Sequence, residues 1–256
     1  GQNGPDYCLD CHASREKLIT SAGPAAPNPQ AAIAEAFGQG ALYMERWEKV
    51  LVDGATFPES IHGLNGCISC HGGVQEPDKE AAHAGIVRNP SAEPQPVCGE
   101  CHPNVVEHSQ YGLHATLRGF ETTIHQRSFS KDHSTLDAAL QQSCTSCHTT
   151  CGDCHVSQPA IAGGGFVKGH NFTRTPSMTR TCTVCHGSRV GSEFQGLNEG
   201  VPSDVHFSQG SMTCMNCHNG PDLHGQPAEC QSCHPGPEAS RLPPEDHRYA
   251  GVQEPS

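Results

Sequence analysis

All 16 cysteines of this 256-residue chain lie in one repeated pattern, Cys-x-x-Cys-His. The eight copies are Cys8, Cys11 and His12; Cys67, Cys70 and His71; Cys98, Cys101 and His102; Cys144, Cys147 and His148; Cys151, Cys154 and His155; Cys182, Cys185 and His186; Cys214, Cys217 and His218; and Cys230, Cys233 and His234. Each copy places two thiols three positions apart and an imidazole directly after the second thiol. These residue types can form two covalent bonds through sulfur and one bond to a metal.

This spacing is the attachment site of c-type haem. The two thiols form thioethers on one edge of the porphyrin, and the adjacent imidazole binds the iron as the proximal ligand. The sequence therefore predicts eight covalently bound haem c groups, with the eight motif histidines as proximal iron ligands.

Other uses of paired cysteines fit the pattern less well. Two Cys-x-x-Cys pairs could build a four-thiolate zinc site, but zinc does not require a histidine after every pair. The densest run, Cys144 to His155, lacks ferredoxin spacing, which argues against iron–sulfur clusters. Structural disulfides give no reason for the trailing histidines either. We therefore expect haem.

Ten of the 18 histidines lie outside the motifs and could serve as distal iron ligands. We favour His62, His83, His114, His125, His170, His206, His224 and His247, and keep His108 and His133 in reserve. Two imidazoles fill all six coordination positions of a haem iron together with the porphyrin. Such a haem exchanges electrons but binds no substrate, so an array of them would conduct electrons.

The composition is poor in side chains that build a core. Aromatic residues make up 5% of the chain, Gly and Pro number 28 and 20, and the mean hydropathy is -0.51. With so few apolar side chains, burial of apolar surface cannot offset the conformational entropy that the chain loses on folding. We expect a multihaem cytochrome c fold, with mostly loops and short helices wrapped around a closely packed haem chain and little or no sheet, as a single domain over 1–256.

Two segments between and after the motifs have their own expected structure. Apolar residues recur at helical spacing in the long first gap, and Asn28 and Pro29 suit the start of a helix. This pattern predicts a helix over 30–52. The segment 235–256 is rich in proline and is expected to be an extended C-terminal tail.

The charge excludes some partners. The formal net charge is -12 without a basic run, so no nucleic acid is expected as a partner. The sequence contains no apolar stretch of membrane-spanning length, so no membrane span is expected. Because c-type haem is attached outside the cytoplasm and the chain begins at Gly1, we interpret it as an exported, processed protein, extracellular or at the cell surface, otherwise periplasmic.

Several segments carry a family resemblance. The double motif from Cys144 to His155, the stretch Gly163–Phe172, the stretch Cys185–Gly191, Asp204–His206, and Ala82–Val87 ahead of Cys98 resemble the multihaem c-type cytochromes of anaerobic respiration. Within that group, chains dense in bis-histidine haem are similar to extracellular cytochrome filaments (nanowires). The resemblance implies head-to-tail partners identical to this chain, a possible ligand such as His247 shared between subunits, and redox partner proteins or extracellular acceptors such as metal oxides.

An enzyme is the main alternative. Octahaem reductases for tetrathionate, nitrite or hydroxylamine belong to the same broad group, and each needs one haem with an open or exchangeable position. No motif here replaces the proximal histidine by lysine, as the pentahaem nitrite reductases do. We therefore expect an electron conduit without enzymatic activity, with a reductase or a monomeric periplasmic electron carrier as the alternatives.

Overall fold

The structure is a computed structural model that describes residues 6–23, 44–143 and 149–224. Within these ranges the chain forms short helices and loops, and the only β-type pairing is an isolated antiparallel bridge between Ser157 and Phe166. The prediction of short helices and loops with little or no sheet is confirmed for this part of the chain.

The α-helices are α1 (Tyr7–His12), α2 (Arg15–Ala22), α4 (Cys67–His71), α5 (Lys79–Ala82), α6 (Pro103–Ser109), α7 (Leu113–Thr116), α8 (Arg118–Arg127), α9 (Ser134–Ser143), α10 (Cys151–His155), α11 (Thr183–His186), α12 (Ser192–Gln195), α13 (Val205–Ser208), α14 (Cys214–Cys217) and α15 (Gly220–Leu223). Short 3-10 helices are η2 (Glu48–Val50), η3 (Gly63–Asn65), η4 (Pro90–Ala92), η5 (Cys98–Glu100) and η7 (Ala160–Ala162). Two π-helical turns, η8 (Met178–Cys182) and η9 (Gly187–Gly191), flank α11.

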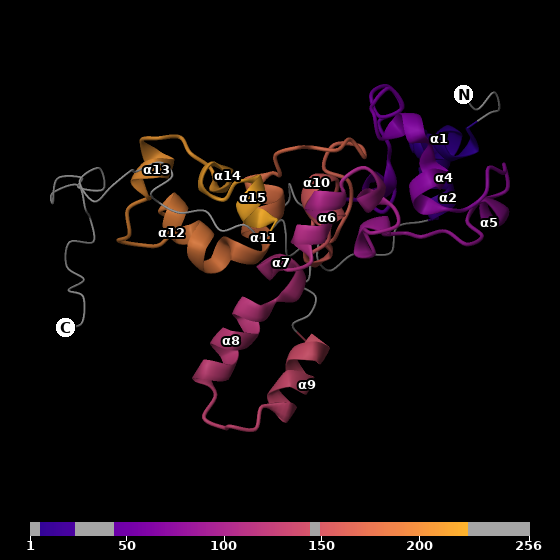
Figure 1. The fold of residues 1–256 in the computed structure, drawn as a ribbon. Helices are drawn as coiled ribbons and strands as arrows, with labels where there is room; N and C mark the ends of the chain where they lie inside the picture. The colour runs from indigo at the N-terminus through magenta and orange to yellow at the C-terminus, as the bar shows by residue number, and fades with distance from the viewer. Residues whose placement is uncertain (1–5, 24–43, 144–148, 225–256) are drawn as a thin grey trace, which may run out of the picture.

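The helices of the main body are spread along one direction (Figure 1). Helices α1, α2, α4 and α5 lie at one end, α6 and α10 lie in the middle, and α12 and α13 lie at the other end (Figure 1). The chain also doubles back along this body: the Gly169 carbonyl, after α10, accepts from the Asp53 amide, and α15 lies in the middle again (Figure 1).

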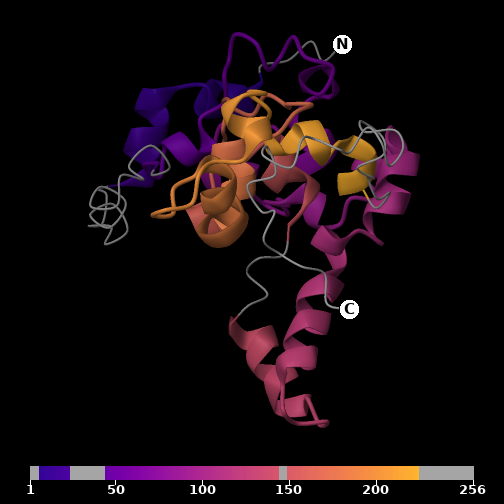
Figure 2. The ribbon, with the colours of Figure 1, turned by 90° about the vertical axis from the view of Figure 1, so that its left-hand side faces the viewer.

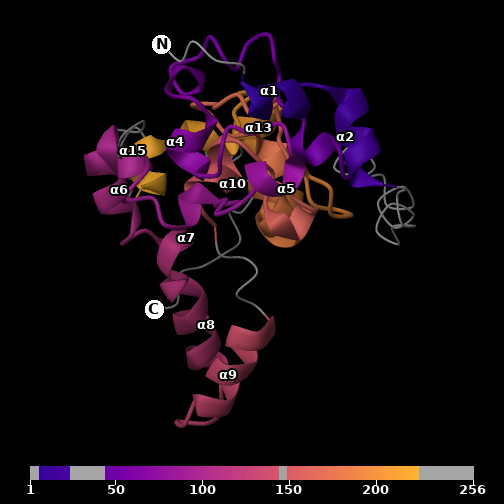
Figure 3. The ribbon, with the colours of Figure 1, turned by 90° about the vertical axis from the view of Figure 1, so that its right-hand side faces the viewer.

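A helical arm projects from this body. It consists of α8, α9 and the loop 128–133 between them, and it stands clear of the other helices in all three views (Figures 1, 2 and 3). Phe129 in its loop is fully exposed. The arm carries His125 and His133 away from the body, which matters for the assignment of ligands below.

The described part of the chain buries few side chains. Its buried hydrophobic residues are Leu18, Phe57, Val106 and Val156, and many large apolar residues remain exposed, among them Ile61 at 80% and Leu64 at 75%. Burial of these side chains alone does not account for the fold. This agrees with the expectation from composition that the chain needs another source of core.

The motifs form short helical turns because of their spacing. Residues three and four positions apart lie on one face of a helix, so Cys8, Cys11 and His12 project to the same side of α1. Neighbouring side chains stop the exposed helix starts from fraying. Thr150 and Asp153 form a capping box at α10, and Thr213 and Asn216 form one at α14.

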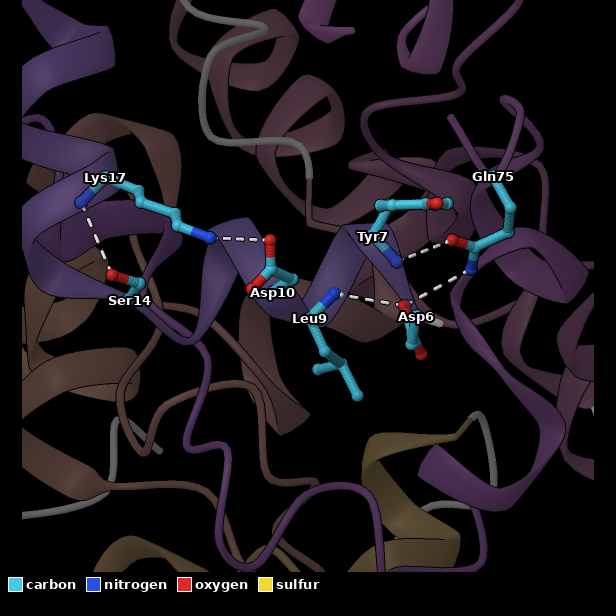
Figure 4. Close-up of polar contacts among 7 residues, drawn as sticks. All are labelled: Asp6, Tyr7, Leu9, Asp10, Ser14, Lys17 and Gln75. Carbon is cyan, nitrogen blue, oxygen red and sulfur yellow. Dashed lines mark hydrogen bonds and ion pairs between the residues drawn. The ribbon is translucent and has the colours of Figure 1, made fainter. Parts of the chain in front are cut away.

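Polar contacts join the first motif to the segment after the second (Figure 4). Asp6 caps α1 by accepting a hydrogen bond from the Leu9 amide at 3.0 Å, and it also accepts one from Gln75 Nε2 at 3.2 Å. The Tyr7 amide donates to Gln75 Oε1 at 2.9 Å. Gln75 thus ties the start of α1 to the loop that follows α4.

The prediction of a helix over 30–52 is wrong at its C-terminal end, and the rest of that segment lies outside the described residues. Between 44 and 52 the structure has only the 3-10 helix η2, after which Leu51 is extended. Long-range hydrogen bonds compete with the helix here: the Val52 amide donates to the His12 carbonyl, and the Lys49 carbonyl accepts from the Phe166 amide. The predicted tail 235–256 also lies outside the described residues.

Candidate functional site

Five motif histidines each face one histidine from outside the motifs. The ring centroids are 6.2 Å apart for His12 and His83, 6.3 Å for His102 and His62, 5.8 Å for His71 and His170, 6.1 Å for His186 and His114, and 6.2 Å for His155 and His224. All five partners are among the histidines that the sequence favours as distal ligands.

These separations suit two imidazoles that bind one metal ion from opposite sides. A metal–nitrogen bond is about 2 Å long and the ring centre lies about 1 Å beyond the nitrogen, so the two ring centres would be about 6 Å apart. Aromatic rings in direct contact can also have centroids about 4.5–7 Å apart, so the distance alone does not decide. Each of the five pairs combines one motif imidazole with one other imidazole, which is the combination expected of a proximal and a distal ligand.

A further histidine pair among the described residues has a different geometry. His125 and His133 stack in the arm with centroids 4.1 Å apart, and His125 Nε2 is 2.6 Å from a carboxylate oxygen of Asp137. Stacked rings this close leave no room for a metal ion between them. His125, which the sequence favours as a distal ligand, is therefore paired within the arm and not with a motif histidine of the described part.

Backbone carbonyls orient many of these imidazoles through Nδ1. His12 contacts the Val50 carbonyl at 3.1 Å, His83 the Lys79 carbonyl at 2.7 Å, His71 the Val87 carbonyl at 2.8 Å, and His155 the Thr173 carbonyl at 2.6 Å. A ring that donates from Nδ1 keeps the lone pair on Nε2, which is the form that binds a metal. The donor set therefore fits a six-coordinate iron.

Burial keeps several of the paired imidazoles neutral. It lowers the pKa of His12, of His62 and of His224, and neighbouring imidazoles lower each pKa further. Burial also lowers the pKa of His170 to about 4, with His71 as the next cause. A neutral imidazole is the state that a metal requires of a histidine ligand.

The cysteines of different motifs approach one another in chain order. The thiols of Cys8 and Cys67 share a hydrogen bond, as do those of Cys182 and Cys214. Burial is the first cause that raises the pKa of Cys98, and the nearby thiols of Cys151 and Cys70 add to it. Burial is also the first cause that raises the pKa of Cys154, and Asp153 and then Cys182 add to it. The six described motifs therefore form a motif row, in the order of the motifs that begin at Cys8, Cys67, Cys98, Cys151, Cys182 and Cys214.

The thiols of the motif row favour the neutral form. Burial is the first cause that raises the pKa of Cys67 to about 12, that of Cys154 to about 12 and that of Cys182 to about 11. Neutral sulfur is what a thioether provides.

One other group of potential metal ligands occurs among the described residues. Side-chain atoms of Asp6, Cys8 and Cys67 lie within 4.8 Å of one another. This group joins the first cysteines of two motifs and contains no second thiol of either pair. It does not form the cluster of four cysteine and histidine ligands that a structural zinc site requires.

A rigid loop presents His170 to His71. Gln158 is fully buried and donates from Nε2 to the carbonyls of Ala162 at 3.1 Å and Gly164 at 3.0 Å, which fixes the loop ahead of His170. The Gly169 carbonyl accepts from the Asp53 amide at 2.8 Å. Gly169 has φ 54°, and a Cβ there would lie 2.8 Å from the Asp53 nitrogen, so this close approach requires glycine.

The other predicted ligands are placed as follows. His108 contacts the Asn104 carbonyl through Nδ1 at 2.6 Å, and Asp204 holds Nδ1 of His206 at 2.9 Å. Cys144, Cys147, His148, Cys230, Cys233, His234 and His247 lie outside the described residues.

Sequence reasoning missed the aromatic residues beside these imidazoles. Phe172 stacks on His62 with centroids 3.8 Å apart, and Phe57 and Phe166 contact His170 at 4.6 Å and 4.5 Å. Phe166 and Phe172 flank His170 in the sequence, which was the available signal. Phe57 is distant in the sequence and gave none.

No protein family, curated protein or solved structure was found to match this chain. Among the described residues, none of the helices combines the length and the apolar character needed to cross a membrane. The functional argument therefore depends on the motifs and on the geometry of the imidazole pairs.

Proposed function

We propose that this chain is an electron-transfer protein that holds eight c-type haem groups, most or all of them with two histidine ligands. The observation that carries the proposal is the set of five imidazole pairs, each with one motif histidine and with centroids 5.8–6.3 Å apart. The eight complete motifs explain why each pair lies beside two cysteines. No enzymatic activity is proposed.

The chain's own residues have three roles in this proposal. The cysteine pairs attach the cofactor, the paired imidazoles hold the iron, and the backbone carbonyls at Nδ1 fix the orientation and raise the basicity of the rings. The haem supplies reversible one-electron chemistry when it is bound. Two protein ligands on each iron exclude water and substrate from it.

The motif row supports conduction along the molecule. The thiols of Cys8 and Cys67 share a hydrogen bond, and the body is elongated (Figure 1). Cofactors attached at neighbouring motifs would therefore have neighbouring edges. Electrons would pass along the motif row from the motif at Cys8 toward the motif at Cys214, or in reverse.

The proposal predicts that all haem iron in the mature protein is low-spin. We expect EPR and optical spectra of the ferric protein without a high-spin component, and no spectral change when carbon monoxide is added to the ferrous protein, because every coordination position is filled. A haem that is high-spin or binds carbon monoxide would contradict full bis-histidine ligation and would favour a reductase.

A finer proposal concerns assembly. The resemblance to extracellular cytochrome filaments leads us to propose that copies of this chain stack head to tail, which would join one motif row to the next. Negative-stain images of the native, haem-loaded protein are expected to show filaments with a regular repeat. Single particles at every protein concentration would contradict assembly and leave electron transfer within one molecule untouched.

A further inference from the structure

We infer that the iron held between His71 and His170 has a higher reduction potential than the iron held between His12 and His83, and that the surroundings of His170 set this difference. The inference deepens the proposed function and rests on it. It compares two neighbouring positions in the motif row.

The hydrogen bonds at Nδ1 distinguish the two positions. In the first pair, both His12 and His83 contact a backbone carbonyl, at 3.1 Å and 2.7 Å. In the second pair, His71 contacts the Val87 carbonyl at 2.8 Å, but Nδ1 of His170 is buried without a hydrogen-bond partner. An acceptor at Nδ1 makes imidazole a stronger donor and so stabilises ferric iron. His170 lacks this effect.

The packing around His170 acts in the same direction. Phe57 and Phe166 contact its ring edge-on at 4.6 Å and 4.5 Å, and the Phe172 centroid lies 5.7 Å away. Aromatic faces are weak hydrogen-bond acceptors and do not replace a carbonyl. Apolar surroundings also disfavour the extra positive charge of ferric iron relative to ferrous iron. Both effects raise the reduction potential.

The loop holds His170 in this environment. His170 has φ 73°, a left-handed conformation that is unfavourable for a residue other than glycine and persists only where the surroundings fix it. The Asp53 amide bonds the adjacent Gly169 carbonyl, and Phe57 is itself buried. These contacts restrain the His170 imidazole, so that it does not rotate to bring Nδ1 to a hydrogen-bond acceptor.

The first measurement is a comparison of two sites in the native protein. His170→Ala and His83→Ala each identify one haem by the low-spin EPR signal that disappears, and an EPR-monitored redox titration of the unmodified, haem-loaded protein then gives the potential of each. As the applied potential is lowered, we expect the haem bound by His170 to be reduced before the haem bound by His83. If it is reduced at the same potential as the His83 haem or at a lower one, the inference is wrong.

A matched pair of variants tests the cause. Phe166→Asn offers an amide oxygen to Nδ1 of His170, whereas Phe166→Leu removes the ring but stays apolar. We expect the asparagine variant alone to shift the equilibrium of the His170 haem toward the ferric state by about tenfold, or about 59 mV for one electron. Equal shifts in both variants, or none, would overturn the role of Nδ1. Absence of haem from the mature protein would instead refute the proposed function.

Discussion

A chain produced without haem attachment is expected to be largely unfolded. Within the described residues, the large apolar side chains that are buried are Leu18, Phe57, Val106 and Val156. Each contributes about 1.5–3 kcal/mol, which is far below the entropy cost of ordering a chain of this length. Far-UV circular dichroism of the haem-free chain should show little helix, and limited proteolysis should degrade it rapidly.

The control for this prediction is the same chain after haem attachment, in the same buffer and with its termini unchanged. It should keep its helical signal and resist protease. If the haem-free chain showed the same spectrum and the same resistance, the helices would be stable without the cofactor. The interpretation of haem as the source of the core would then be wrong.

Replacing His83 by alanine is expected to convert one haem of the eight to the high-spin state. His83 is the partner of His12 at 6.2 Å, and its loss leaves one iron with a single protein ligand. The new species should appear in the ferric EPR spectrum and should bind carbon monoxide when reduced. The short helix α5 that ends at His83 is exposed at its surface, so the fold should tolerate the change.

His125→Ala is the matched control because it removes the same side chain from a different environment. His125 stacks on His133 and pairs with Asp137 in the arm. We expect all haem iron to stay low-spin in this variant, although the sequence favours His125 as a ligand. A high-spin signal from His125→Ala, or none from His83→Ala, would show that the imidazole pairs do not mark the iron positions.

The local features of the fold could be predicted from the sequence, because they depend on near neighbours. The spacing of Cys8, Cys11 and His12 places all three on one helical face, and α4 and α10 likewise each contain a whole motif. The scarcity of apolar residues predicted a thin core. Short helices without a sheet follow from frequent glycine and proline.

The pairing of histidines could not be predicted, because it depends on packing between distant segments. His62 stands just before the motif at Cys67, yet its partner is His102 in the next motif. His114 faces His186. The motif nearest to His114 in the sequence is the one that ends at His102, and the motif of His186 is the second described motif after it. Proximity in sequence carried no information on either pair.

The arm shows a second limit of sequence reasoning. His125 and His133 could be counted as spare imidazoles, but nothing in their spacing indicated that α8 and α9 would leave the body together (Figure 1). Likewise, the helix expected over 30–52 does not reach its predicted end, because the Val52 amide bonds the distant His12 carbonyl. Long-range partners outweighed local periodicity in both cases.

The five imidazole pairs also interlock the chain. They join His12 to His83, His62 to His102, His71 to His170, His114 to His186, and His155 to His224. Each span overlaps the next, so every peptide bond between 12 and 224 lies inside at least one of them. With iron bound between the rings, cleavage of a single peptide bond in this range would leave two fragments that metal coordination still links. The cleaved molecule would keep its path for electron transfer.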